Sequence, residues 1–208
     1  MIPYTSHKIT DADKQAVLDA LDSPHISGGG PITTQFERAL ADVTGFKYAV
    51  VVNSGTAALH LAYLTALGNK RVITMPTLTF VATASMALLA KSQPLLKDVN
   101  ETTLVNDEFL DVTVDYAGYP TRNGKVIDAS QGLRPDMNYG YADAVTISLH
   151  ATNGMTTGEG GVVLTDHEDI AELCRQLRDH GRDNGECVMP GYNYRLPDLN
   201  CALGLSQL

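Results

Sequence analysis

The sequence predicts an α/β fold of three layers, α/β/α, with a mainly parallel central sheet. Apolar runs of strand length alternate along the chain with amphipathic helical patterns, and most of these runs are apolar at nearly every position. Strands of that kind are buried on both faces, as they are where helices cover both sides of a parallel sheet. The chain has 208 residues, 44% of them hydrophobic, which is enough apolar material for such a core.

The period of the apolar residues assigns each element in turn. In the first half it predicts a helix, a helix, a strand, a helix and a strand at 11–21, 32–43, 48–52, 56–67 and 71–75. Thr10 is a candidate cap for the first helix, and the glycine-rich stretch 27–31 separates it from the second. The strand, tight turn, helix and strand from 48 to 75 predict a right-handed β-α-β unit.

The second half is richer in strands. The pattern predicts a helix at 81–90, strands at 94–99, 112–115, 125–128, 144–148 and 161–165, and a helix at 167–180. Turn residues fill 118–124, which leaves little room for a crossover helix. Because no repeat, low-complexity tract or linker interrupts the pattern, we expect a single domain over residues 1–208.

Composition narrows the classes of function. The chain has 15 Lys and Arg against 24 Asp and Glu, a net charge of −9, without the basic patch of a nucleic-acid-binding face. Cys174, Cys187 and Cys201 lack metal-ligand spacing, and a chain of this size needs no disulfides, so we expect no metal site and a reducing cytoplasm. The first residues do not read as a signal peptide, and the most apolar run, 81–90, contains hydroxyl residues, so membrane insertion is not indicated.

In open parallel sheets ligands bind beyond the carboxyl ends of the strands, and three of these ends carry informative residues. The turn 53–56 brings Gly55 and free N–H groups to a helix start, which suits a phosphate or a plain helix cap. Asp128 ends another strand, where its carboxylate can pair with a cationic heteroaromatic nitrogen or a metal, or cap the next turn. The glycine- and hydroxyl-rich loop 148–161 suits phosphate, although a loop between antiparallel strands looks similar.

Five stretches, taken together in order and spacing, resemble the pyridoxal-phosphate-dependent nucleotide-sugar aminotransferases of the DegT/DnrJ/EryC1/StrS family. They are 52–61 (VNSGTAALHL), 76–83 (PTLTFVAT), 127–131 (IDASQ), 148–161 (SLHATNGMTTGEGG) and 191–196 (GYNYRL). RDHGR at 178–182 lies between the last two, and the resemblance runs from Ile2 to the last residue. It implies a fold like the large domain of aspartate aminotransferase, which in the family is followed by a small C-terminal domain that is absent here.

The resemblance implies a site for pyridoxal 5'-phosphate or pyridoxamine 5'-phosphate. Ser54, Gly55, Thr56 and the Ser148 hydroxyl would hold the cofactor phosphate. Asn193 would reach the phosphate of a neighbouring subunit, since the family builds each site across a homodimer interface. A keto-sugar nucleotide and an amino-acid donor would be the small-molecule ligands.

Three residues would contact the ring of that cofactor. Phe80 would stack on it, and Gln131 would lie by its 3-oxygen. Asp128 would bond to the ring nitrogen and keep it protonated, so that the ring serves as an electron sink. Judged without the family, Phe80 reads as a core aromatic and Asn193 as a turn residue.

At the position of the family's catalytic lysine this sequence has Asn153. An amide can neither form a Schiff base nor shuttle a proton, and no lysine follows Lys125. His150, three residues earlier, is also common among the family's aminotransferases and is not counted as a replacement base. Asn153, Asp128 and His150 are the candidate catalytic positions. Three explanations of Asn153 stay open: an engineered replacement of lysine, a natural homologue that has lost transamination, or a different use of the cofactor.

A further departure from the family is length. Relatives have two extra helices around a strand where this sequence has the compressed stretch 99–128, and Asp115 stands where histidine is usual. Loss of helices there would expose apolar surface, so we expect a partner subunit to cover it. The alternative to an aminotransferase is a non-catalytic homologue or half of a split enzyme, which would bind the cofactor, a nucleotide sugar or a partner subunit. A dinucleotide-dependent oxidoreductase is disfavoured because no GxGxxG follows the first strand.

Overall fold

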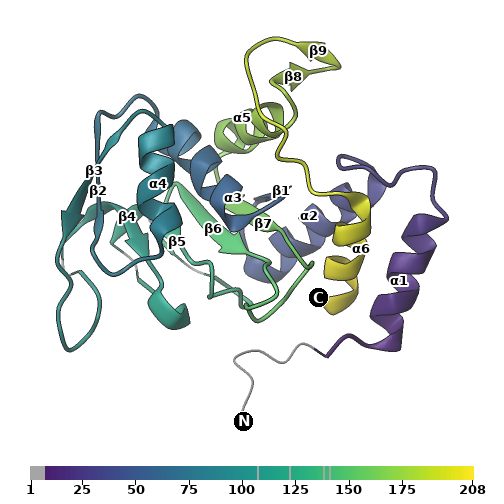
Figure 1. Ribbon diagram of the computed structural model, residues 1–208, viewed down its shortest axis with the longest axis horizontal. Helices are drawn as coiled ribbons and strands as arrows, with labels where there is room; N and C mark the ends of the chain where they lie inside the picture. The colour runs from purple at the N-terminus through teal and green to yellow at the C-terminus, as the bar shows by residue number, and fades with distance from the viewer. Residues whose placement is uncertain (1–7, 107, 122, 138, 141) are drawn as a thin grey trace.

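A five-stranded sheet lies at the centre of the computed structural model, which describes residues 8–106, 108–121, 123–137, 139–140 and 142–208. The strand order is β1 (Tyr48–Val52), β7 (Gly161–Thr165), β6 (Ala144–Ser148), β5 (Gly124–Asp128) and β4 (Leu110–Val114). Strands β4, β5 and β6 are parallel, and β7 runs antiparallel to both of its neighbours. The predicted α/β fold with a mainly parallel sheet is confirmed (Figure 1). The start of the family resemblance, at Ile2, lies outside the described residues.

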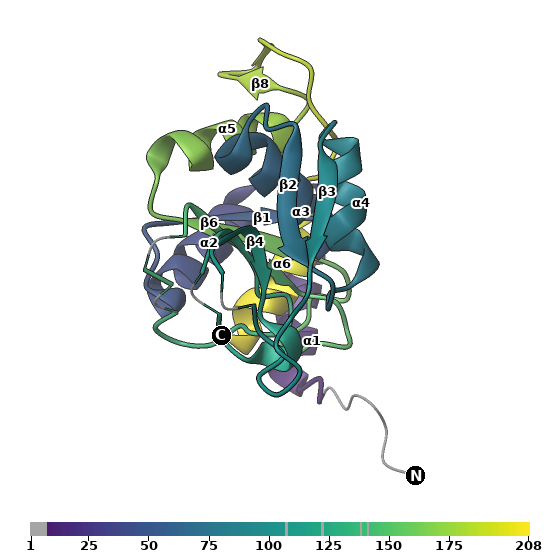
Figure 2. The same ribbon diagram turned by 90° about the vertical axis from the view of Figure 1, so that its left-hand side faces the viewer.

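A second, two-stranded sheet extends the first. Strands β2 (Val72–Pro76) and β3 (Gln93–Lys97) pair in parallel, and β2 lies beside β4. Side chains take the place of a backbone ladder between these two strands. Asp111 accepts hydrogen bonds from the Thr74 backbone N–H at 2.9 Å and hydroxyl at 3.0 Å, and its own N–H donates to that hydroxyl at 2.9 Å. Lys70 pairs with the same carboxylate, so a buried charge holds β2 against the main sheet. Figure 2 shows β2 and β3 beside β4.

The predicted β-α-β unit is wrong in its pairing. Its two strands, β1 and β2, are not neighbours: β1 forms the edge of the sheet and pairs with β7, whereas β2 lies at the other end beside β4. Helix α3 (Gly55–Ala62) and the π-helical turn η1 (Tyr63–Leu67) carry the chain between them. The physical reason is that an apolar period reports that a strand is buried and does not report which strand lies beside it.

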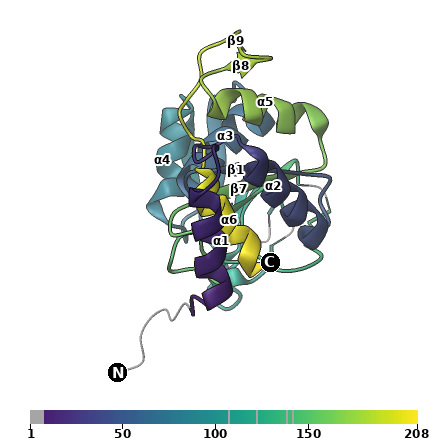
Figure 3. The same cartoon turned by 90° about the vertical axis from the view of Figure 1, so that its right-hand side faces the viewer.

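Helices cover both faces of the sheet. On one face lie α3, α4 (Val81–Leu89) and α5 (Glu168–Arg178), and on the other lie α2 (Pro31–Thr44) and α6 (Asp198–Gln207), with α1 (Asp11–Leu21) packed on α6 (Figure 3). Strand β1 alternates between the two cores. Val50 and Val52 pack towards α3, whereas Ala49 and Val51 pack towards α2. Because the strand contributes to a core on each face, the prediction of three layers is confirmed.

The short elements complete the chain. A one-turn 3-10 helix, η2 (Tyr116–Gly118), follows β4, and a hairpin of β8 (Arg182–Asp183) and β9 (Glu186–Cys187) projects from the body of the molecule (Figure 1). Some predicted bounds shift by a few residues: β3 ends at Lys97, β4 begins at Leu110, and α5 ends at Arg178. Among the described helices, none is both long and apolar enough to cross a bilayer.

The compressed stretch combines exposed apolar side chains, at Leu104, Phe109, Tyr116 and Tyr119, with a polar cover over one side of β4. On the α2 side of β4 the strand presents Thr113 and, just beyond its end, Asp115, and both are bonded to Thr121. Tyr139 is buried beside these residues, and its hydroxyl donates a hydrogen bond to the Asp115 carboxylate. Polar contacts thus cover this side of β4, whereas exposed apolar side chains remain elsewhere in 99–128, so the expectation that a partner subunit covers apolar surface there stays a prediction.

Candidate functional site

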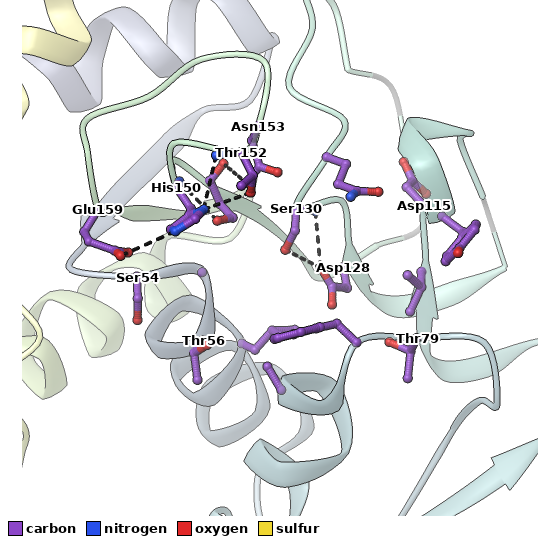
Figure 4. Close-up of a pocket in the computed structure, with 18 residues that line it drawn as sticks. Ser54, Thr56, Thr79, Asp115, Asp128, Ser130, His150, Thr152, Asn153 and Glu159 are labelled. Atoms are coloured by element: carbon purple, nitrogen blue, oxygen red, sulfur yellow. Dashed lines mark hydrogen bonds and ion pairs between the residues drawn. The ribbon is translucent and has the colours of Figure 1, made fainter. Parts of the chain in front are cut away.

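A cavity of about 610 Å³ opens where the carboxyl ends of β1, β4, β5 and β6 meet, at the edge of the sheet predicted for ligands. Figure 4 shows Ser54 and Thr56, from the start of α3, on one side and Asp128 and Ser130 on the other. The lining residues are Ser54, Gly55, Thr56, Leu59, Thr79, Phe80, Ala82, Val114, Asp115, Tyr116, Asp128, Ser130, Gln131, Ser148, His150, Thr152, Asn153 and Glu159.

The start of α3 forms an anion-binding end of the cavity. The Ser54 hydroxyl caps the helix by accepting a hydrogen bond from Ala57 N–H at 3.0 Å. The N–H groups of Gly55 and Thr56, the first two residues of the helix, have no acceptor within it and lie at the positive end of its dipole. A Cβ on Gly55 would lie 2.8 Å from the Ser148 Cβ, so only glycine lets α3 approach the end of β6 this closely. A phosphate fits this chemistry.

We expect Gly55→Ala to weaken phosphate binding at this end by at least roughly tenfold and to cost about 1–3 kcal/mol of stability, because the new methyl must displace Ser148. Titration calorimetry with pyridoxamine 5'-phosphate and a denaturant melt measure the two effects. Gly154→Ala is the matched control, since it lies in the adjacent loop and its added Cβ meets nothing within 4 Å. Binding by Gly55→Ala equal to that of the natural protein would contradict this account of the anion-binding end.

Asp128 is the buried carboxylate of the cavity, with 4% of its surface exposed. Ser130 donates to one oxygen through its hydroxyl at 2.6 Å and its N–H at 3.2 Å. The Thr83 hydroxyl donates to the other at 2.9 Å and accepts from Thr79 at 2.7 Å. Burial raises the pKa of Asp128, while these hydrogen bonds act in the opposite direction. No cation pairs with it among the described residues, so a cationic ligand would supply its missing counter-charge.

The turn after β4 supports the same wall. Asp115 N–H donates to the Asp128 carbonyl at 2.9 Å, and Ala117 N–H donates to Gln131 Oε1 at 3.0 Å. Burial raises the pKa of Asp115, and hydrogen bonds from Tyr139 and Thr121 oppose the shift. Gln131 therefore lines the cavity with its amide held by the backbone of the turn.

The loop after β6 carries the candidate catalytic residues. His150 Nδ1 lies 3.2 Å from the Thr152 N–H that donates to it, and its Nε2 lies 3.6 Å from a Glu159 carboxylate oxygen (Figure 4). The Thr152 hydroxyl also lies 2.8 Å from His150 Nδ1, so Thr152 orients the imidazole. Asn153 is half-buried, and its amide donates to the Ser148 carbonyl at 3.1 Å. No lysine is among the described residues that line the cavity.

Two predicted cofactor residues differ in their placement. Phe80 lines the cavity and is 72% exposed, so the interpretation as a core aromatic is wrong. Asn193 is exposed and lies outside the lining of this cavity, where its carbonyl accepts from the Asn53 amide at 3.3 Å. The other candidate residues all line the cavity. Thr79, Thr83, Thr152 and Glu159 were not singled out from the sequence, because hydroxyls and a carboxylate in such segments carry no signal of their own.

Comparison with known proteins identifies a matching family model and similar sequences. A model of the DegT/DnrJ/EryC1/StrS aminotransferase family matches residues 7–110 and 128–208. The chain is 34% identical over 244 residues to a UDP-4-amino-4,6-dideoxy-N-acetyl-beta-L-altrosamine transaminase of Campylobacter jejuni, covering 100% of this chain and 64% of the relative. The alignment is longer than the chain, so the relative has residues that this chain lacks, and the skipped range 111–127 is where the sequence is compressed.

Solved structures agree in fold. The Helicobacter pylori PseC aminotransferase, involved in the biosynthesis of pseudoaminic acid, aligns with a TM-score of 0.86 at 30% identity, over 99% of this chain and 64% of that one. The putative sugar aminotransferase Spr1654 of Streptococcus pneumoniae in its PMP form aligns with a TM-score of 0.87 at 25% identity, over 99% and 65%. The chain thus spans about 64% of the length of the curated relatives it matches.

Proposed function

The chain belongs to the DegT/DnrJ/EryC1/StrS aminotransferase family, and on that premise we propose that it binds pyridoxal or pyridoxamine 5'-phosphate and serves amino transfer to a keto-sugar nucleotide. The relatives' names support this substrate class, and the PMP form of Spr1654 supports the cofactor. The observation that carries the proposal is the pairing, in one cavity, of an anion-binding helix start with a buried carboxylate that has no cationic partner among the residues the structure describes.

The residues present fit that cofactor. The N–H groups of Gly55 and Thr56 and the Ser148 hydroxyl would hold its phosphate, in a cradle that a Cβ at Gly55 would fill. Asp128 would hold the ring nitrogen, and exposed Phe80 is free to stack on the ring. Because both Asp128 oxygens already accept hydrogen bonds from hydroxyl groups, the site favours a protonated ring nitrogen over a metal ion.

The protein's own groups divide the work of the reaction. When bound, the cofactor supplies a sink for the electron pair left when a C–H bond of the substrate breaks. Asp128 would hold the ring nitrogen in its protonated form, and the Thr83 and Ser130 hydroxyls fix the Asp128 carboxylate in a buried position. Asn153 cannot accept a proton, so the role of the family's lysine is not filled at that position in this chain.

We further propose a homodimer built from single large domains over residues 1–208, located in the cytoplasm. Asn193 supports the dimer, since it is exposed outside its own cavity and its backbone is anchored by Asn53. Three free cysteines, two of them buried, support a reducing compartment. Light scattering at micromolar concentration tests the assembly, and a monomer would contradict it.

Titration with each cofactor form, followed by absorbance, tests the proposed function. We expect saturable binding of both, weakened roughly a hundredfold in Asp128→Ala, which removes a buried charge partner. Borohydride reduction followed by intact mass is expected to give no stoichiometric adduct, because the described lining has no lysine. Asp111→Ala, another buried carboxylate outside the cavity, is the control. Absence of binding to either form, in a protein that is folded by circular dichroism, would overturn the proposal.

A further inference from the structure

One wall of the cavity is built by the part of the chain that the family model does not match. That model skips residues 111–127, and Val114, Asp115 and Tyr116 from this stretch all line the cavity. The wall therefore lies in the stretch that the family model leaves unmatched. Asp115 carries a buried negative charge in this wall, and that charge has no role in the reaction proposed above (Figure 4).

Three neighbouring side chains hold the Asp115 carboxylate in one position. Its side chain is 0% exposed. The Thr121 N–H and hydroxyl donate to one oxygen at 2.8 and 2.9 Å, and the Tyr139 hydroxyl donates to the other. Arg134 donates to that Tyr139 hydroxyl at 3.0 Å and lies 3.9 Å from the carboxylate. A carboxylate with donors on both oxygens and a nearby guanidinium has one position, and it fixes the backbone of its own residue.

That backbone holds two residues of the proposed cofactor site. The Asp115 N–H donates to the Asp128 carbonyl at 2.9 Å, and the Asp115 carbonyl accepts from Gly118 N–H at 3.0 Å, which closes the one-turn helix η2. Inside that turn Ala117 N–H donates to Gln131 Oε1 at 3.0 Å. Because Oε1 accepts this hydrogen bond from the turn, the NH₂ group of the Gln131 amide is the part that can donate to a ligand oxygen.

The turn is also strained. Ala117 has φ 54° and ψ 26°, the left-handed region that a residue with a Cβ rarely adopts. Such a conformation persists only where the surroundings over-determine it, and such positions cluster at ligand sites. The locked carboxylate two residues earlier provides that constraint.

We propose that Asp115 is a positioning residue for the cofactor site, which orients the Gln131 amide as a donor to the ring's 3-oxygen and holds the backbone of Asp128. This inference rests on the proposed function. It assigns to the wall that the family model leaves unmatched the task of fixing the ring, at a site whose lysine position holds an amide.

The experiment compares two Asp→Asn variants on the same strand and its end. Asp115→Asn keeps the shape and removes the charge. Asp111→Asn is the matched control, because that carboxylate is also buried and bonded, to Lys70 and Thr74, but does not line the cavity. Each is titrated with pyridoxamine 5'-phosphate, and the absorption maximum of the bound form is recorded. The side-chain amide NMR signals of Gln131, identified by their loss in Gln131→Glu, are followed in the free protein.

We expect Asp115→Asn to bind about tenfold more weakly, to shift the absorption maximum and to move the Gln131 signals. Asp111→Asn should lower the unfolding temperature and leave all three readouts unchanged. Tyr139→Phe, which removes one donor to Asp115 and keeps its ring, should act in the same direction as Asp115→Asn and serves if that variant does not fold. Binding, spectrum and signals like those of the natural protein in both Asp115→Asn and Tyr139→Phe would overturn the inference while the proposed function stands. Absence of binding by the natural protein would overturn both.

Discussion

Arg178→Ala is expected to lower the free energy of unfolding by about 3–5 kcal/mol, because it leaves the Glu37 carboxylate buried without its partner. Both side chains are about nine-tenths buried. Arg178 donates to the Glu37 carboxylate and to the Val51 carbonyl at 2.6 Å, while Val51 N–H donates to Glu37 at 3.0 Å. Strand β1 is the edge of the sheet, so this ion pair satisfies backbone groups that no neighbouring strand reaches.

Arg175→Ala is the matched control for this expectation. Arg175 lies on the same helix and approaches the same carboxylate at 3.7 Å, but its side chain is 37% exposed. Pairs of that kind contribute about 0–1 kcal/mol. Denaturant unfolding of both variants measures the difference, and the double variant Glu37→Met/Arg178→Met should recover part of the loss because no charge is then left unpaired. A loss below about 1 kcal/mol for Arg178→Ala would mean that solvent reaches Glu37.

The same pair illustrates what the sequence could predict about the fold. The run 48–52 identifies β1 as a buried strand, because every residue in it is apolar. Its place at the edge of the sheet depends on contacts with β7 and α5, which lie more than a hundred residues away. Propensity and period are local, so they predicted the elements well and the strand pairing poorly.

The short strands β8 and β9 were not predicted from the sequence, for a different reason. The hairpin of β8 and β9 turns at Asn184 and Gly185, a favoured pair for a two-residue turn, and both have positive φ. Its strands have only two residues each, which is too short for any alternation to be visible. The turn signal was present in the sequence, but a pattern search for strands could not find what it joined.

Some residues of the candidate site could likewise be predicted from the sequence, and others could not. Gly55, Asp128 and Ser148 were predictable because each ends or follows a strand, and strand ends meet at one edge of a parallel sheet. Thr83 was not predictable, since its hydroxyl matters only through a contact with Asp128, 45 residues along the chain. Asp115 was noted as a departure from the family, but its hydrogen-bond partners emerge only from the folded turn. Motifs identify groups that meet the ligand, whereas supporting groups depend on tertiary contacts.

Asn153→Lys is expected to convert reversible binding of pyridoxal 5'-phosphate into covalent attachment. Position 153 lines the cavity, is half-buried, and lies on the loop that begins at Ser148. A lysine amine there would be partly desolvated, which lowers its pKa and raises the fraction of neutral nucleophile. The amine would form a carbon–nitrogen double bond with the cofactor aldehyde and release water. Borohydride reduction followed by intact mass should then show one adduct per chain, against none in the natural protein.

Gly154→Lys is the control that separates position from the mere presence of an amine. Gly154 is the next residue along the loop, has open space around it, and does not line the cavity. We expect little adduct in that variant, since its amine would lie in solvent with a higher pKa. An adduct in Asn153→Lys alone would establish that the site retains the geometry for a covalent bond and lacks only the amine. Equal adducts in both variants would show non-specific reaction. No adduct in Asn153→Lys, with reversible binding intact, would mean that the cofactor aldehyde does not face the loop after β6, and the assignment of position 153 would be wrong.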